Sequence, residues 1–108
     1  MAVQPNVLLV VLDSVRARNV SHLGYAESTT PCLDAFAEGD RAVRYTNARA
    51  PGTWSLPSHV SIFTGLHVRE HGITDRSKRL QQGHTVWETL ADAGYETGVF
   101  SSNPYLTE

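Results

Sequence analysis

The sequence Val7-Leu8-Leu9-Val10-Val11-Leu12-Asp13 contains six consecutive apolar residues and is the most informative part of the chain for its fold. A short, continuous apolar run that is rich in β-branched residues is typical of a strand buried on both faces. Such strands occur mostly in parallel sheets that are flanked by helices. The run therefore predicts an α/β fold in which Asp13 directly follows the first strand.

Helix signals follow this strand along the chain. Thr30-Pro31 predicts an N-cap followed by proline at the first helical position, and Gly39 suits the position after the end of that helix. Residues 56–65 predict a short, largely buried helix, because their apolar side chains fall on more than one side. The segment 85–88 has the spacing of a capping box, which predicts the start of another helix.

The remaining segments suggest an incomplete sheet. Residues 42–46 and 96–101 are further candidate strands, and residues 67–84 are expected to form a long loop. The right-handed crossover rule predicts that the strands at 7–12 and 96–101 are parallel neighbours in one sheet. A doubly wound sheet needs more strands than these, since its edges otherwise remain unpaired. We therefore expect residues 1–108 to be the N-terminal, incomplete part of a larger α/β domain.

The composition is that of an ordinary globular protein and excludes several functional classes. The 108 residues include 9 Lys and Arg against 11 Asp and Glu, a net charge of -2, which argues against a strongly basic nucleic-acid or lipid-surface binder. No apolar run reaches the ~18 residues that span a membrane, and the N-terminus lacks the pattern of a secretion signal, so we expect a cytoplasmic protein. The single cysteine, Cys32, excludes an internal disulfide and a cysteine-rich zinc site.

Asp13 is a candidate metal ligand. Open parallel sheets bind their ligands at the carboxyl ends of the strands, which is the expected position of Asp13. A carboxylate there suits a hard cation such as calcium or magnesium, or zinc. The alternative for Asp13 taken alone is a capping or turn aspartate.

Ser55 and His59 lie at the start of the predicted buried helix. A hydroxyl at that end meets the free N–H groups and the positive end of the helix dipole, which favour a phosphate, a sulfate or a developing alkoxide. His59 lies about one turn further along and could contact the same anion. The alternatives are an ordinary serine N-cap and a solvated histidine.

His67 and His71 have the i, i+4 spacing of a helical metal-binding pair. Gly65 and Gly72 bracket them and argue against the helix that such a pair needs. We therefore expect these histidines to have no role in metal binding.

These motifs, taken together and in order, resemble the N-terminal part of the sulfatases, in the alkaline phosphatase superfamily. The opening strand with Asp13 resembles the first strand of the family, and TPCLD at 30–34 and YTNA at 45–48 are similar to its next two landmarks. SLPSH at 55–59 falls on the sulfatase signature C/S-x-P-S-R. Further landmarks continue the match, so that the resemblance covers roughly residues 5–105.

The resemblance implies an alkaline-phosphatase-like α/β domain, with a mostly parallel sheet flanked by helices, that is several-fold longer than this chain. It places the first metal ligand of the family at Asp13 and the nucleophile at Ser55. In sulfatases this cysteine or serine is oxidised to formylglycine, whose hydrate attacks sulfur, whereas phosphate-transferring relatives use an unmodified serine or threonine. The implied metal is divalent, with calcium expected first and magnesium, manganese or zinc as alternatives.

Two residues depart from the family pattern. Ser14 stands where a typical sulfatase has a second aspartate, and a serine hydroxyl is the weaker metal ligand. His59 stands where the signature has arginine, and a neutral imidazole cannot imitate a fixed guanidinium fork. Both departures argue against formylglycine at Ser55 and against arylsulfatase activity. They leave open the hydrolysis of esters by an unmodified Ser55.

The first functional hypothesis is therefore a sulfatase-like, metal-dependent hydrolase of small-molecule sulfate esters. Asp13 would bind the metal, Ser55 would attack sulfur or phosphorus, and His59 would contact the anion or support Ser55. The second hypothesis is a phosphodiesterase or phosphotransferase of the same superfamily that acts on phosphate esters with an unmodified serine. The third is a non-catalytic, truncated chain. None of them involves nucleic acid or a membrane, and the oligomeric state stays open.

Two expectations concern the folded chain. A shared metal and anion site requires the Asp13 carboxylate and the Ser55 hydroxyl to lie within about 8 Å of each other at the carboxyl end of the sheet. Residues 1–108 alone are expected to fold only marginally and to be inactive, because the sheet is cut and its edges would meet water.

Overall fold

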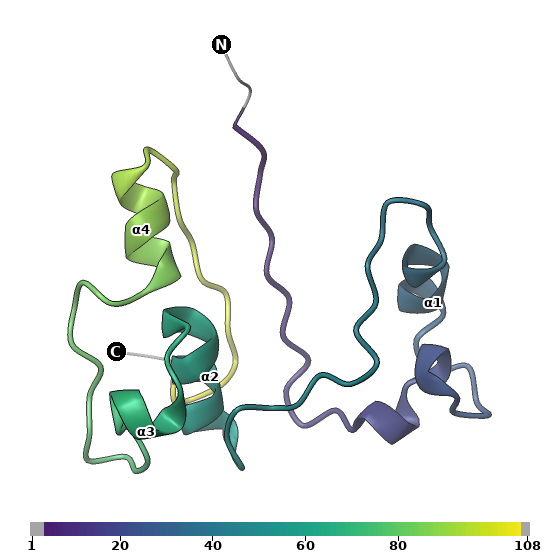
Figure 1. Ribbon diagram of the computed structural model, residues 1–108, viewed down its shortest axis with the longest axis horizontal. Helices are drawn as coiled ribbons and strands as arrows, with labels where there is room; N and C mark the ends of the chain where they lie inside the picture. The colour runs from purple at the N-terminus through teal and green to yellow at the C-terminus, as the bar shows by residue number, and fades with distance from the viewer. Residues whose placement is uncertain (1–3, 107–108) are drawn as a thin grey trace. The chain divides into compact units, whose positions relative to one another are not determined.

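The computed structural model describes residues 4–106, and all of its regular elements are helical (Figure 1). The chain divides into an N-terminal unit, Met1–Ala48, and a C-terminal unit, Arg49–Glu108. The N-terminal unit contains two short 3-10 helices and one α-helix, which are η1 (Ala17–Asn19), η2 (Ser21–Leu23) and α1 (Pro31–Ala37). The C-terminal unit contains three α-helices, which are α2 (Ser55–Thr64), α3 (Val68–His71) and α4 (Val86–Asp92).

Three of these helices confirm the helices predicted from local signals. Helix α1 begins at Pro31, and α4 begins after Thr85, as their capping residues predict. Helix α2 begins at Ser55, one residue before the predicted start. It ends at Gly65, which has a φ of 71°, a left-handed conformation that glycine adopts without a steric penalty.

Helix α3 lies in the segment that was predicted to be a long loop, so that prediction is wrong for these four residues. Its start is capped by His67 and Glu70. The Arg69 N–H donates to Nδ1 of His67 at 3.2 Å, and the His67 N–H donates to the Glu70 carboxylate at 2.7 Å. Histidine is not among the usual N-cap residues, which is why the signal was missed.

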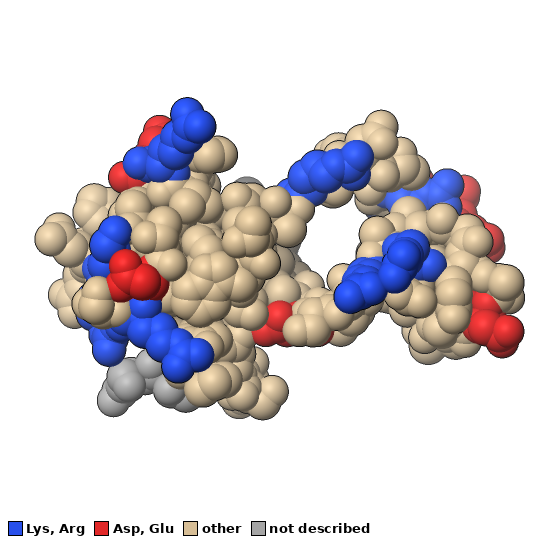
Figure 2. All heavy atoms as spheres, turned by 90° about the horizontal axis from the view of Figure 1, so that it is seen from below, with Lys and Arg blue, Asp and Glu red and all other residues tan. Residues whose placement is uncertain are grey.

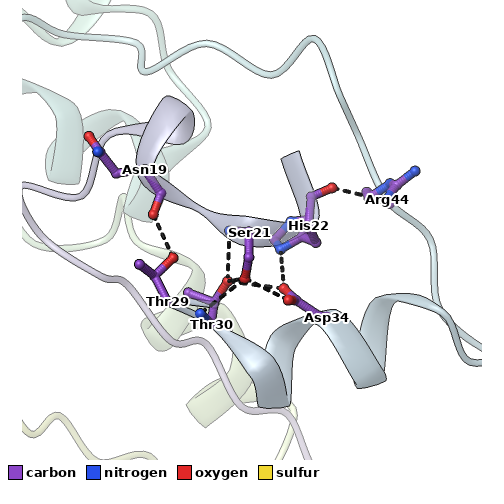
Figure 3. A network of polar contacts seen from close by, with 7 residues as sticks. All are labelled: Asn19, Ser21, His22, Thr29, Thr30, Asp34 and Arg44. Carbon is purple, nitrogen blue, oxygen red and sulfur yellow. Dashed lines mark hydrogen bonds and ion pairs between the residues drawn. The ribbon is translucent and has the colours of Figure 1, made fainter. Parts of the chain in front are cut away.

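A network of polar contacts holds the N-terminal unit together (Figure 3). The Ser21 hydroxyl donates to one oxygen of Asp34 at 2.5 Å, and the Thr30 hydroxyl donates to the other at 3.0 Å. Thr30 precedes α1 but does not cap it with its side chain, because its hydroxyl is used in this network. The bond from Ser21, with further contributions from Thr30 and the nearby His22, lowers the pKa of the Asp34 carboxyl below its usual value.

The predicted strands at 7–12, 42–46 and 96–101 do not form in residues 4–106, and this corrects the prediction of a parallel pair. A strand requires ladder hydrogen bonds to a neighbour, and 7–12 and 96–101 lie in different units. The 7–12 segment instead runs as extended chain, drawn in purple in Figure 1. Its apolar side chains are exposed, Leu8 to 87%, and so is Phe100, to 101%. The apolar side chains of these two segments are therefore not covered by other residues of the described part of the chain.

The hydrophobic core is correspondingly small. Among residues 4–106, the buried apolar side chains are only those of Val20, Pro57, Val60 and Ile73. Within the same residues, no helix is long and apolar enough to cross a membrane. The cytoplasmic location stays a prediction.

Helix α4 depends on a carboxylate that accepts several hydrogen bonds at its start. Glu88 accepts from the backbone N–H groups of Gly83 at 2.5 Å, His84 at 3.1 Å and Thr85 at 2.9 Å, and from the Thr85 hydroxyl at 2.7 Å. These bonds, led by the one from Gly83, lower the pKa of Glu88 from 4.5 to about 2. The ionised carboxylate is therefore the form that stabilises this end of the helix.

We expect Glu88→Gln to lower the stability of the protein at neutral pH. The folded-state pKa lies below the unfolded one, so the contribution of Glu88 is present above about pH 4.5 and is lost as the pH falls towards 2. Urea unfolding of wild type and variant should therefore differ most at neutral pH and converge in acid. Glu96→Gln is the matched control, because Glu96 makes no hydrogen bond in the described part of the chain and should cause no such difference. A gap that stays constant with pH would contradict the role of the ionised carboxylate.

Candidate functional site

The predicted site residues lie in both units of the chain. Asp13 belongs to the N-terminal unit, and Ser55 and His59 belong to the C-terminal unit. Their convergence within about 8 Å therefore stays a prediction. Each half of the site has a geometry of its own.

Ser55 is the first residue of α2 and follows Trp54, whose backbone is extended. Helix α2 has ten residues, so Ser55 lies where the free N–H groups and the positive end of a helix dipole meet. The loop before it lies close to this first turn. A Cβ on Gly52 would meet the Ser58 nitrogen at 2.9 Å and the Pro57 ring at 3.1 Å, so only glycine fits there. The loop therefore packs against the first turn of α2, the end of the helix at which negative charge is stabilised.

His59 is held against the backbone of Ser55. Its Nδ1 lies 2.8 Å from the Ser55 carbonyl oxygen, and the residue is only 6% exposed. A carbonyl only accepts hydrogen bonds, so Nδ1 must carry the proton in this contact. The neutral ring then presents a lone pair at Nε2, and the ring can donate from Nε2 only as an imidazolium. His59 therefore cannot contact an anion in its neutral form, which an arginine at this position always could.

An aromatic series extends from His59 to α4. The rings of His59 and Phe63 pack edge to face with centroids 5.8 Å apart, and Phe63 packs in the same way on Trp87 at 5.7 Å. The indole N–H of Trp87 is buried and has no hydrogen-bond partner among residues 4–106. Helix α4 thus supports the ring of His59 through two aromatic side chains.

His71 and His67 both make structural hydrogen bonds. The Ile73 N–H donates to Nδ1 of His71 at 3.0 Å, so the neutral ring carries its proton on Nε2 and donates it to the Ser61 hydroxyl at 3.0 Å. This bond joins α3 to the buried side of α2. His67 is occupied as the N-cap of α3.

Asp13 lies at a sharp turn that ends the exposed apolar segment. Ser14 has a φ of 62°, a left-handed conformation that is uncommon for a residue other than glycine. Its hydroxyl lies 3.4 Å from one carboxylate oxygen of Asp13. Among the described residues, no group of three or more His, Cys, Asp or Glu side chains is arranged to hold a metal ion. Asp13 thus fits a hard cation as a single ligand, without a complete site around it.

A cluster next to Ser55 was not predicted from the sequence. The rings of Trp54 and Tyr105 pack edge to face with centroids 5.4 Å apart, and the Arg76 guanidinium lies over the Tyr105 ring at 4.8 Å. Arg76 also donates a hydrogen bond to the Tyr105 hydroxyl. The contact places a cation on a ring that packs on the residue before Ser55. No local spacing reveals it, because the three residues are far apart in the chain.

Charged side chains are dispersed on the face that Figure 2 shows. On the face drawn in Figure 2, Lys and Arg side chains occur in several separate groups, some of them beside acidic side chains. This distribution agrees with the nearly balanced charge of the chain.

Comparison with known proteins gives a family match over almost the whole chain. Residues 5–105 match the Sulfatase family. The chain is 35% identical to arylsulfatase A of Bos taurus over 103 residues, which are 88% of this chain and 20% of that protein. It is equally similar to arylsulfatase A of Homo sapiens, with the same identity and coverage. It is 29% identical to an N-acetylgalactosamine-6-O-sulfatase of Bacteroides thetaiotaomicron, covering 89% of this chain and 20% of that protein.

The chain spans about a fifth of the length of these curated relatives. No solved structure shows a significant match.

Proposed function

The chain belongs to the sulfatase family, and from this membership we propose that it is the N-terminal segment of a metal-dependent hydrolase of sulfate esters. The family implies an alkaline-phosphatase-like α/β domain. The exposed apolar segments at 7–12 and around Phe100 support this proposal, because a mostly parallel sheet would bury such surface. The substrate would be a small molecule that carries a sulfate ester.

We propose Ser55 as the nucleophile, and its place at the first position of α2 is the observation that carries the proposal. Its oxygen would attack sulfur, the bond from sulfur to the departing alcohol would break, and the proton lost by Ser55 would end on the alcohol oxygen. Water would then attack the sulfuryl-serine, releasing sulfate and restoring the hydroxyl. The N-terminal end of α2 would stabilise the negative charge that develops.

The residues around Ser55 favour a nucleophile that is not converted to formylglycine. The signature arginine is replaced by His59, which is 6% exposed and hydrogen-bonded to the carbonyl of Ser55 itself. A buried imidazole in that position cannot form the bidentate contacts of a guanidinium. We therefore propose a catalytic cycle on the unmodified hydroxyl of Ser55.

Asp13 is the residue of this chain that would bind the divalent metal, with calcium expected first and magnesium, manganese or zinc as alternatives. The exposed carboxylate at the Ser14 turn supports this proposal. When bound, such a metal lowers the pKa of a nucleophile and stabilises charge on the transferred group. The described residues form no complete metal site. Further ligands would have to come from other parts of the whole protein.

A second candidate function is a phosphodiesterase or phosphotransferase of the same superfamily. The observation that favours it is again His59, because an unmodified serine beside a residue other than arginine resembles the phosphate-transferring relatives. Both candidates use Ser55 and Asp13 in the same roles. Comparing turnover of aryl sulfate and aryl phosphate esters by the whole protein would decide between them.

We expect mass spectrometry of the whole protein, purified from its own source, to find Ser55 unmodified. Formylglycine would lower the mass of the peptide that contains Ser55 by two hydrogen atoms. The control is a His59→Arg variant produced in the same cells, which restores the signature residue and shows whether the cells can convert a serine. Formylglycine in the wild-type peptide would contradict the proposed unmodified nucleophile.

A further inference from the structure

A surface hollow in the N-terminal unit is lined by side chains that carry or can carry positive charge. It is lined by six residues, Ala17, Arg18, His22, Leu23, Arg44 and Thr46. The ionisable residues among them are two arginines and one histidine, and no carboxylate lines the hollow. Neither Asp13 nor Ser55 lines it, so the hollow is separate from the proposed catalytic residues.

The two arginines keep most of their donors available. Arg44 donates one hydrogen bond, from Nη1 to the carbonyl oxygen of His22 at 3.1 Å, which holds its guanidinium at the hollow. A guanidinium has five N–H donors, so most of them stay free for a ligand. Neither Arg18 nor Arg44 forms an ion pair with a carboxylate among residues 4–106.

His22 is positioned by the polar network of the N-terminal unit (Figure 3). Its Nδ1 lies 3.4 Å from Asp34 Oδ1, and Asp34 is itself held by the hydroxyls of Ser21 and Thr30. This Nδ1 atom is buried and makes no hydrogen bond among the described residues, so the contact with Asp34 is electrostatic. To contact an oxyanion, Nε2 has to carry a proton, which it does in the imidazolium form. The histidine thus adds an ordered side chain to the two exposed guanidinium groups.

We propose that this hollow binds an oxyanion, namely a sulfate or phosphate group, at a site additional to the catalytic one. Guanidinium groups match the oxygens of such anions through paired hydrogen bonds. Guanidinium groups bind free and esterified oxyanions in the same way, so the anion could be a free inorganic ion or the anionic group of a larger ester. The proposal is independent of the catalytic role of Ser55.

The test is equilibrium dialysis of radiolabelled inorganic sulfate against the whole protein at low ionic strength. Arg18→Ala and Arg44→Lys should each lower the affinity of the hollow for sulfate about tenfold or more. Arg18 makes no hydrogen bond in the described part of the chain, so its replacement should not disturb folding. Arg41→Ala, which removes an equal charge from the same unit outside the hollow, should leave the binding unchanged. Ser55→Ala should also keep the site, even if the proposed catalytic function is wrong.

Competition separates the two sources of the anion. Inorganic phosphate and methyl sulfate are added in turn to the dialysis with labelled sulfate. Displacement by both would indicate that the site accepts an esterified group, and displacement by phosphate alone would restrict it to free ions; either result supports an oxyanion site. Equal binding by wild type and the Arg18→Ala variant, or an equal loss in Arg41→Ala, would overturn the proposal.

Discussion

Ser55→Ala is expected to reduce the turnover of sulfate or phosphate esters by the whole protein about a thousand-fold or more. The change removes the proposed nucleophile, and activity without the nucleophile is limited to what binding and charge stabilisation supply. Because Ser55 is the first residue of α2 and is not among the buried residues of the described chain, the variant should fold like wild type. The measurement is kcat on aryl sulfate and aryl phosphate esters, with circular dichroism to compare folding.

Ser61→Ala is the matched control for this experiment. Ser61 is a serine of the same helix, but it is buried to 7% exposure and accepts a hydrogen bond from His71. Its loss should cost about 1 kcal/mol of stability and leave turnover within a few-fold of wild type. If Ser55→Ala retains activity, Ser55 is not the nucleophile. If both variants lose activity equally, the loss reflects the packing of α2 and not the chemistry of Ser55.

Residues 1–108 expressed alone are expected to show no cooperative thermal transition and no hydrolase activity. The buried apolar side chains in the described residues are only those of Val20, Pro57, Val60 and Ile73, whereas the apolar segment at 7–12 is exposed. A core of this size cannot offset the conformational entropy of folding. Among the described residues, no group of three or more His, Cys, Asp or Glu side chains is arranged to hold a metal ion, whereas hard cations usually take six or more oxygen ligands.

Calorimetry and assays of aryl sulfate and aryl phosphate esters check this expectation, with calcium, magnesium, manganese or zinc added in turn. Extrinsic dye binding should report the exposed apolar surface. The informative control is the whole protein under the same conditions. A sharp calorimetric transition together with metal-dependent turnover that disappears in Ser55→Ala would show that the 108 residues are a complete enzyme.

The helices were predictable because their signals are local. Pro31, Gly65 and the pair Thr85 and Glu88 act within one turn of the helix ends that they define. Helix α3 escaped prediction although its signal is equally local, because His67 replaces the usual capping residue. The predicted strands did not form among the described residues, for a different reason. A strand is stabilised by a partner that is distant in the chain, so an apolar run such as 7–12 indicates what must be buried but not what buries it.

The family and the residues proposed for the site could be named from the sequence, because family motifs are short and ordered along the chain. Asp13, Ser55 and His59 could all be named from such motifs. Their convergence depends on contacts between the two units and stays a prediction.

The structure was needed to show how side chains that are distant in sequence meet. It showed the contact of Trp54 with Tyr105 and Arg76, the bond between Ser61 and His71, and the cationic hollow in the N-terminal unit. It also decided which nitrogen of His59 carries the proton, since that depends on a hydrogen bond to the Ser55 carbonyl. The physical reason is the same in each case. Hydrogen bonds and ring contacts act over a few ångströms in space, and spacing along the chain predicts such distances only within a single helix or turn.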